Sequence, residues 1–217
     1  MRFCEALGIE PGITAVIGSG GKSSLLDRLA AELRPRHSVV LCTTTHMFPA
    51  PGMPLLTEPD EAELGRLLEA ERAVCTGRLA EDGRLHAPGL PLPRLAALAE
   101  YVIVEADGSK RLPLKAHAAH EPVIPAGTAR TVCVVGLSGL GRPVAEAAHR
   151  PELFAPQGGT VTPELLAGVL NREALADVYF LNQTDLRGMQ AARRLAALLE
   201  RPSVCGSLRE GVLECLY

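Results

Sequence analysis

The sequence lacks three features that would assign it to a membrane, to nucleic acid or to an oxidising compartment. None of its 217 residues lie in a stretch approaching the ~20 apolar residues of a membrane span, and the N-terminus has no secretory apolar run. The net charge is only −3 with both signs scattered, so no basic footprint for nucleic acid exists. The six cysteines form no Cys-x-x-Cys pair, which indicates reduced thiols. We therefore expect a cytoplasmic protein that binds small molecules, with neither a membrane nor nucleic acid as partner.

Lysine is also scarce, although arginine is common. The chain has three lysines, Lys22, Lys110 and Lys115, and all lie in segments that contain glycine or acidic residues. An ammonium group differs from a guanidinium in size, hydration and donor geometry, so a compact cationic site can require lysine specifically. The three lysines are therefore candidates for functional sites.

Short apolar runs rich in β-branched residues alternate with helical patterns along the chain, which is typical of a parallel sheet with crossover helices. Strands are predicted at 13–17, 38–43, 73–76, 101–105, 131–135, 178–181 and near Val204. Helices are predicted at 23–33, at 57–72 with Thr57 as cap, and at 93–100, 163–170 and 186–200. We predict an α/β protein with three layers and a mostly parallel sheet of the P-loop NTPase type. Without a repeat or linker, residues 1–217 are expected to form a single domain.

A glycine-rich segment lies directly between the first predicted strand and the first predicted helix. Backbone N–H groups in such a turn can surround a phosphate, and the helix N-terminus adds positive charge. A strict P-loop has a glycine where this chain has Val16, but the Gly-Lys-Ser core is present. The predicted nucleotide-binding residues are Gly18, Ser19, Gly20, Gly21, Lys22, Ser23 and Ser24. The alternative is an ordinary strand-to-helix turn.

The run VIVEADG resembles a Walker B strand, in which an acid at the strand end organises magnesium through water. Side chains alternate along a strand, so Glu105 and Asp107 are expected on one face. We predict a magnesium site formed by Ser23 with Glu105 or Asp107, and the choice between the two carboxylates stays open. A solvated acidic turn is the alternative.

Hydroxyl groups and a histidine follow the second predicted strand, as Thr43, Thr44, Thr45 and His46. Ligands of open α/β sheets gather at the carboxyl ends of the strands. The threonines are therefore predicted to contact substrate, the γ-phosphate or magnesium, and His46 to take a proton or bind substrate. A structural histidine is the alternative. Together with His46, the predicted catalytic residues are Lys22 and Asp107.

Asn182, Gln183, Thr184 and Asp185 follow another predicted strand. This run resembles the Asn-Lys-x-Asp motif that reads guanine, in which the acid accepts two hydrogen bonds from the base. Gln183 replaces the lysine that packs on the base, so the preference between GTP and ATP stays open. Asn182 and Asp185 are the predicted base-binding residues, although both types are also common in turns.

The segment from 107 to 128 has little periodicity and is predicted to be a long ordered loop, which in a compact domain is usually functional. It brings charged and titratable side chains close to the predicted metal site. These can bind an anionic substrate or respond to the γ-phosphate, and solvated surface charge is the alternative. The residues are Lys110, Lys115, His120 and Glu121.

Taken in order, several segments resemble the YqeC family. They are GSGGKSS, TTTHM, VIVEADGSKRLPLKA, HEPVIP, VVGLSGLGRP and LNQTD. Gln183 and His117 are the departures from the family pattern. The resemblance implies an accessory protein for selenium-dependent molybdenum hydroxylases, with a role in selenium cofactor biosynthesis. A molybdenum hydroxylase or its cofactor is then the implied partner.

Together these features predict an accessory protein that binds GTP or ATP with Mg²⁺ and hydrolyses it. Phosphoryl chemistry depends on positioning and charge neutralisation, which this set of residues supplies. Two alternatives stay open. One is a nucleotide-gated module that binds a cofactor or docks a partner with negligible turnover, and the other is a kinase for a small molecule.

Overall fold

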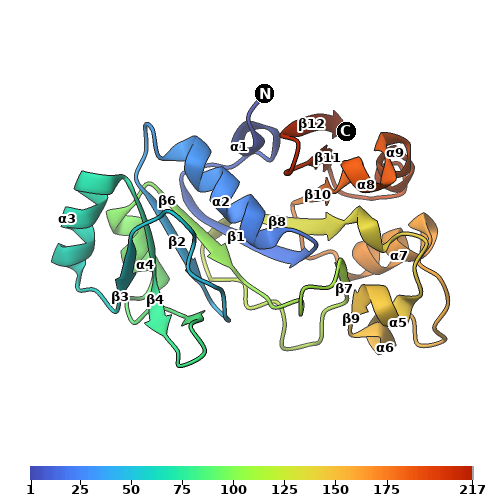
Figure 1. The fold of residues 1–217 in the computed structure, drawn as a ribbon, viewed down its shortest axis with the longest axis horizontal. Helices are drawn as coiled ribbons and strands as arrows, with labels where there is room; N and C mark the ends of the chain where they lie inside the picture. Colours follow the sequence, from blue (N-terminus) through green and yellow to red (C-terminus); the bar gives the residue numbers. More distant parts are fainter. Residues whose placement is uncertain (217) are drawn as a thin grey trace.

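A long twisted sheet runs through the computed structural model, which describes residues 1–216 (Figure 1). Its strands are β1 (Gly12–Ser19), β2 (Val39–Thr43), β3 (Leu55–Thr57), β4 (Ala73–Leu79), β5 (Leu85–His86), β6 (Tyr101–Glu105), β8 (Thr128–Gly136), β10 (Val178–Asn182), β11 (Ser203–Ser207) and β12 (Val212–Leu216). The order is β12-β11-β10-β8-β1-β6-β2-β4-β3, and β5 pairs with β4. All neighbours are parallel except β11 with β12 and β4 with β5. A separate parallel pair joins β7 (Leu114–Lys115) to β9 (Ala148–His149).

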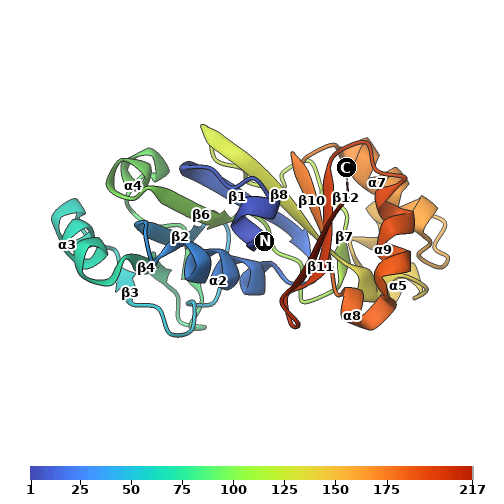
Figure 2. The same ribbon diagram turned by 90° about the horizontal axis from the view of Figure 1, so that it is seen from above.

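Helices cover both faces of the sheet. They are α1 (Phe3–Ala6), α2 (Lys22–Leu33), α3 (Glu61–Glu71), α4 (Leu92–Leu98), α5 (Val144–Ala147), α6 (Pro151–Phe154), α7 (Pro163–Glu173), α8 (Thr184–Arg187) and α9 (Met189–Ala196), with a 3-10 turn at Leu137–Gly139. Alternation along β1 buries Val16 with α1 and α2 on one face, and Ala15 and Ile17 with α7 and α9 on the other. The helices α3 and α4 cover the opposite end of the sheet from α7 and α9 (Figure 2). The predicted three-layer α/β fold with a mostly parallel sheet is confirmed.

The strand order places β1 at a topological switch point. It pairs with β6 on one side and with β8 on the other, although both strands come much later in the chain. Ligands of open α/β sheets bind outside the carboxyl ends of the strands at such a point. The predicted glycine loop, which follows β1 directly, lies there.

Close backbone approach explains two of the loop glycines. A Cβ on Gly18 would lie 2.3 Å from the carbonyl oxygen of Val134, and one on Gly20 would lie 2.4 Å from the Cα of Gly136. Both glycines also have a positive φ, +87° and +86°. The loop is therefore packed against the end of β8 in a conformation that other residues disfavour.

The helix predicted at 57–72 begins later than expected, and Thr57 is not its cap. Thr57 ends strand β3, which pairs with β4, and α3 begins after Asp60. The Asp60 carboxylate accepts a hydrogen bond from the backbone N–H of Glu63 at 2.7 Å. Strand pairing with a distant segment therefore outweighed the local cap signal of Thr57.

Other predicted elements need smaller corrections. The helix predicted at 186–200 is two helices, α8 and α9, which are separated at Gly188 with φ +80°. The loop predicted from 107 to 128 contains β7, and the antiparallel strand β12 was not predicted. Among the described residues, no helix is both long and apolar enough to cross a bilayer.

Candidate functional site

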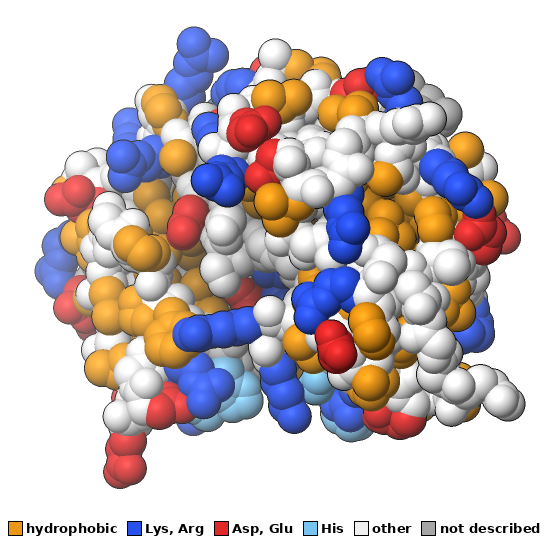
Figure 3. All heavy atoms as spheres, turned by 45° about the vertical axis from the view of Figure 1, so that its right-hand side comes forward, with side chains coloured by type: hydrophobic (Ala, Val, Ile, Leu, Met, Phe, Trp, Pro, Cys, Tyr) orange, Lys and Arg blue, Asp and Glu red, His pale blue; other side chains and the backbone are white. Residues whose placement is uncertain are grey.

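Two pockets meet at the glycine loop. The larger has a volume of ≈ 1090 Å³ and the smaller ≈ 530 Å³. Gly20, Gly21, Ser24 and Gln183 line both. Figure 3 shows a hollowed face of the molecule on which Lys, Arg and His side chains gather. The loop therefore separates two spaces of different size, and both lie at the carboxyl edge of the sheet.

Lys22 opens α2, and its side chain turns back under the glycine loop. The ammonium donates to the carbonyl of Gly18 at 2.8 Å and lies 3.0 Å from Oδ1 of Asp107. Oε1 of Glu105 is 4.0 Å away. Lys22 thus places a buried positive charge between the loop and both predicted acids, while still lining the larger pocket.

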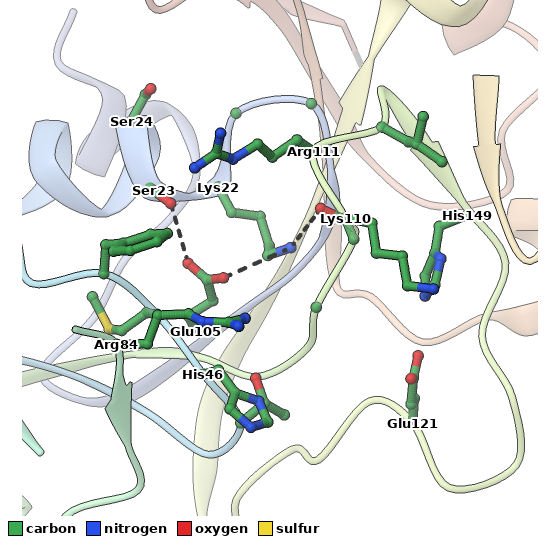
Figure 4. A pocket seen from close by; sticks show the side chains of 18 of the residues that line it. Lys22, Ser23, Ser24, His46, Arg84, Glu105, Lys110, Arg111, Glu121 and His149 are labelled. Carbon is green, nitrogen blue, oxygen red and sulfur yellow. Dashed lines mark hydrogen bonds and ion pairs between the residues drawn. The ribbon is translucent and has the colours of Figure 1, made fainter. Parts of the chain in front are cut away.

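Glu105 ends β6 and lines the larger pocket beside Ser23 (Figure 4). The Ser23 hydroxyl donates to Oε2 of Glu105 at 3.4 Å. Burial raises the pKa of Glu105 to about 7, against the opposing charge of Lys22. A carboxylate and a hydroxyl therefore stand together next to the glycine loop, and this is an oxygen-rich arrangement of the kind that Mg²⁺ prefers.

Asp107 is placed differently and lines neither pocket. It is fully buried, and its Oδ2 accepts from the backbone N–H of Gly18 and from Nε2 of His117, both at 2.8 Å. The ammonium of Lys115 lies 3.4 Å from the same oxygen. Burial opposes its charge, but the hydrogen bond from His117 and the charges of Lys22 and Lys115 outweigh this and lower the pKa of Asp107 to about 2. Because β6 ends at Glu105, strand alternation no longer sets the direction of Asp107.

His117 is a residue whose role the sequence does not reveal. Its Nδ1 lies 2.7 Å from a carboxylate oxygen of Glu173 at the end of α7, and its Nε2 contacts Asp107. Both ring nitrogens face carboxylates, and this arrangement favours the protonated ring, in which both nitrogens donate. Burial lowers the pKa of His117, but the two carboxylates outweigh it and the pKa is raised. No local signal links His117 to Glu173, because 56 positions separate them.

The hydroxyl residues and the histidine at the end of β2 and just after it divide into two groups. Thr43 is buried and donates to the carbonyl of Glu105 at 2.7 Å, and Thr44 donates to the carbonyl of Val123 at 2.7 Å. These two threonines hold the backbone of the site together. Thr45 and His46 line the larger pocket instead. The ring of His46 packs edge-on against His86 with 4.4 Å between centroids.

The predicted charged loop residues also divide. Lys110, His120 and Glu121 line the larger pocket, whereas Lys115 lies inside the protein and contacts Glu121 at 2.5 Å. Further residues also line this pocket. Asp82, Arg84, His149 and Arg150 come from segments distant from the predicted motifs, whereas Phe48 and Arg111 adjoin the predicted His46 and Lys110.

The smaller pocket contains the predicted base-reading residues. The Asn182 side chain donates to the carbonyl of Gly20 at 2.8 Å and accepts from the backbone N–H of Leu208 at 3.1 Å. It therefore joins the glycine loop to the segment after β11. Asp185 lines the same pocket, and its buried Oδ1 has no hydrogen-bond partner among the described residues. A buried carboxylate oxygen without a partner is costly, so Asp185 has an acceptor that no described residue satisfies beside this pocket.

The chain is similar in sequence to one protein family. A profile of the family described as "YqeC protein" matches residues 14–152, which contain the glycine loop, Glu105 and the 107–128 loop. An Escherichia coli (strain K12) protein described as "Uncharacterized protein YqeC" is 35% identical over 164 residues. That alignment covers 71% of this chain but only 63% of the relative's own length. The extent of the profile match and this identity establish that the chain belongs to the YqeC family.

Proposed function

We propose that the protein binds a guanine nucleoside triphosphate with Mg²⁺ across its glycine loop. The phosphates lie against the loop at the edge of the larger pocket, and the base lies in the smaller pocket. The observation that carries this proposal is the position of the loop between the two pockets, with a cation and an acid–hydroxyl pair on one side and Asp185 on the other. The predicted site residues therefore fall into two groups that correspond to the two ends of one ligand.

Asp185 supports guanine over adenine. Guanine presents an N–H and an adjacent amino group, and a carboxylate can accept from both at once. Adenine presents a ring nitrogen acceptor at the corresponding edge, which would face the negative charge. The unpartnered Oδ1 of Asp185 is the acceptor that this reading requires.

Ser23 and Glu105 fit the requirements of Mg²⁺. This ion prefers six oxygen ligands, is often held by one or two protein groups, and completes its shell with phosphates and water. Among residues 1–216 there is no group of three or more His, Cys, Asp and Glu side chains that could hold a metal by itself. The metal would therefore enter together with the nucleotide, and its charge would stabilise the ionised form of Glu105.

The residues around the loop suit phosphoryl chemistry. Lys22 supplies positive charge to the terminal phosphates, and bound Mg²⁺ would supply Lewis-acid charge to the same oxygens. Asp107 does not face the pocket. It contacts the ammonium of Lys22 and accepts a hydrogen bond from the backbone N–H of Gly18, so it would affect the phosphates only through these two groups. We therefore assign Asp107 a positioning role and Glu105 the metal-facing role.

Calorimetry with GTP and ATP in the presence of Mg²⁺ tests this proposal on the wild-type chain, Lys22→Ala and Asp185→Asn. We expect saturable binding with GTP preferred, loss of affinity for both nucleotides in Lys22→Ala, and loss of the GTP preference alone in Asp185→Asn. Arg36→Ala, which removes an exposed cation outside both pockets, is the control. Absence of binding of either nucleotide at ~1 mM would overturn the proposal.

The pathway part of the proposal depends on family membership. We propose that nucleotide hydrolysis serves the maturation of a selenium-dependent molybdenum hydroxylase or of its cofactor. Phosphate release is then expected to increase when such a hydroxylase or molybdenum cofactor is added, and Lys22→Ala should abolish the increase. An unchanged rate with every such partner would contradict this part and leave nucleotide binding intact.

A further inference from the structure

The larger pocket extends well beyond the glycine loop. Its other walls come from the segment after β2, the tip of the β4–β5 hairpin, the 107–128 loop and the segment at β9. Pockets of ~300–1,000 Å³ hold whole small molecules, whereas the terminal phosphates of a nucleotide need only a part of such a volume. The pocket of ≈ 1090 Å³ therefore has space for a second ligand beside the phosphates.

The charges of this pocket do not cancel. Arg84 pairs with Asp82 at 2.7 Å, and Arg150 pairs with Glu121 at 2.6 Å. The remaining acid, Glu105, faces Lys22 and Ser23. Within residues 1–216, neither Lys110 nor Arg111 has a carboxylate partner. These two exposed side chains are the positive charge that the pocket leaves uncompensated.

The backbone at these two positions is unusual. Lys110 and Arg111 are consecutive and both have a left-handed conformation, with φ +49° and +61°. Residues other than glycine rarely adopt this backbone conformation, because their Cβ makes it strained. Residues with such backbone strain are often found at functional sites. In the view of Figure 4, Arg111 extends on the side of α2 and Lys110 on the side of His149. Together they distribute positive charge along the length of the pocket.

His149 lies near the same positive charges. Burial lowers its pKa, and the positive charges of Lys115, Arg150 and Lys110 lower it further. This shift favours the neutral imidazole, which has both a donor and an acceptor nitrogen at the pocket wall. A bound anion in this part of the pocket would meet cations and a hydrogen-bond donor together.

An apolar surface lies beside these charges. Phe48 is 55% exposed although it lines the pocket, and the guanidinium of Arg111 lies 5.8 Å from its ring centroid. Met47 and Leu112 line the same region. An exposed aromatic ring next to a guanidinium favours a flat apolar group, which can stack on the ring while the cation binds a neighbouring negative charge.

We propose that the outer part of the larger pocket is a binding site for a second substrate, a small molecule with a planar apolar part and a phosphate or carboxylate group. Lys110 and Arg111 bind the anionic group, and Phe48 packs against the planar part. This inference rests on the proposed nucleotide function, because that function identifies the neighbouring ligand as the terminal phosphates of a nucleotide. It adds the chemical class of a second small molecule that binds next to those phosphates.

The test uses 1-naphthyl phosphate as probe, with the full chain held in saturating Mg²⁺ and a non-hydrolysable GTP analogue. Binding is followed by the fluorescence anisotropy of the probe. We expect saturable binding to the wild type, at least tenfold weaker binding to Lys110→Gln/Arg111→Gln, and weak binding of neutral 1-naphthol. Phe48→Ala should weaken binding of 1-naphthyl phosphate but not of inorganic phosphate, whose binding is measured by competition. Arg36→Gln/Arg66→Gln removes two exposed positive charges outside the pocket and should bind like the wild type.

Equal affinity in the wild type and Lys110→Gln/Arg111→Gln would overturn the proposal, as would an equal loss in the control variant. A second titration of the probe omits the GTP analogue. Binding that is seen only without the analogue would also overturn the proposal, because the probe would then occupy the glycine loop. GTP binding is measured on the same samples by calorimetry. If the wild type binds the probe in a Lys110- and Arg111-dependent manner but does not bind GTP, the second site stands and the proposed nucleotide function fails.

Discussion

The acids that follow β6 and β10 have opposite surroundings. Asp107, after β6, receives hydrogen bonds from Gly18 and His117 and contacts two lysine ammonium groups. Asp185, after β10, has a buried oxygen without a partner among the described residues. Both acids are expected near a ligand from the sequence. The Oδ1 of Asp107 also accepts no hydrogen bond, but it lies 3.0 Å from the ammonium of Lys22, whereas the Oδ1 of Asp185 has neither a hydrogen bond nor a cation beside it among the described residues. The number of partners an acid already has therefore separates a structural role from a binding role.

Replacement of Asp107 should give the largest effect on stability. In Asp107→Asn the cations of Lys22, Lys115 and His117 lose a shared counter-charge inside the protein. Loss of one partner from a buried ionic network costs about 3–5 kcal/mol, so the free energy of unfolding should fall by about that amount. Urea denaturation measures it. Asp82→Asn breaks the exposed pair with Arg84 and should lower the free energy of unfolding far less, because water screens an exposed ion pair. Equal losses in the two variants would contradict the comparison.

Glu105 is the last residue of β6, two positions before Asp107. The pKa of Glu105 is raised, whereas that of Asp107 is lowered. For Glu105 the pKa is raised from 4.5 to about 7, so its contribution to stability is fully present below pH 4.5 and is lost as the pH rises through 7. This amounts to roughly 3 kcal/mol. In the nucleotide-free protein, the unfolding free energy of Glu105→Gln minus that of the wild type should therefore increase by about this amount between pH 4.5 and 8.

Mg²⁺ with GTP sharpens this prediction, because a bound cation favours the ionised Glu105. The difference between wild type and Glu105→Gln should shrink or reverse at pH 8 when the nucleotide and metal are added. Thermal denaturation over the same pH series measures it. A pH-independent difference without ligand would show that Glu105 is already ionised in the folded protein, and the metal-facing assignment would lose its electrostatic support.

Replacement of Asp185 should change binding and leave stability almost unchanged. Asp185→Asn removes an acceptor for the guanine N–H groups, and hydrogen bonds to charged groups contribute about 1.5–3 kcal/mol each. We expect the binding free energy of GTP to become less favourable by roughly 1.5–3 kcal/mol, while the urea midpoint stays at the wild-type value. The introduced amide can donate to the additional carbonyl of xanthine, so xanthosine triphosphate should bind more tightly than to the wild type. A stability loss as large as that of Asp107→Asn would contradict the comparison.

The parts of the site that are contiguous in sequence could be predicted well. The glycine loop between a strand and a helix, Glu105 at a strand end, and the Asn182–Asp185 turn each combine a local structural signal with suitable chemistry. Their roles as ligand contacts stay predictions. The β2 threonines were harder, since Thr43 and Thr44 use their hydroxyls for backbone carbonyls that come from distant segments.

The elements that differ from prediction do so for two reasons. Thr57 carries a helix-cap signal worth about 1 kcal/mol but pairs as a strand with β4, so pairing across the fold outweighed a local preference. The helical pattern after Asn182 is interrupted at Gly188, whose backbone has a φ of +80°. That break is local, because glycine adopts a positive φ readily and a helix tends to end there.

By itself the sequence determined the α/β class, the YqeC resemblance and the chemistry that each motif offers, because alternating apolar runs and short motifs are local properties. Only the tertiary structure decided which side chains share a space. It buried Asp107 against His117, whose other ring nitrogen contacts Glu173, and it turned Glu105 toward Ser23. It left Lys110 and Arg111 in the larger pocket without acidic partners among the described residues. The physical reason is that charge compensation and burial depend on residues brought together from distant segments, and no local pattern records those contacts.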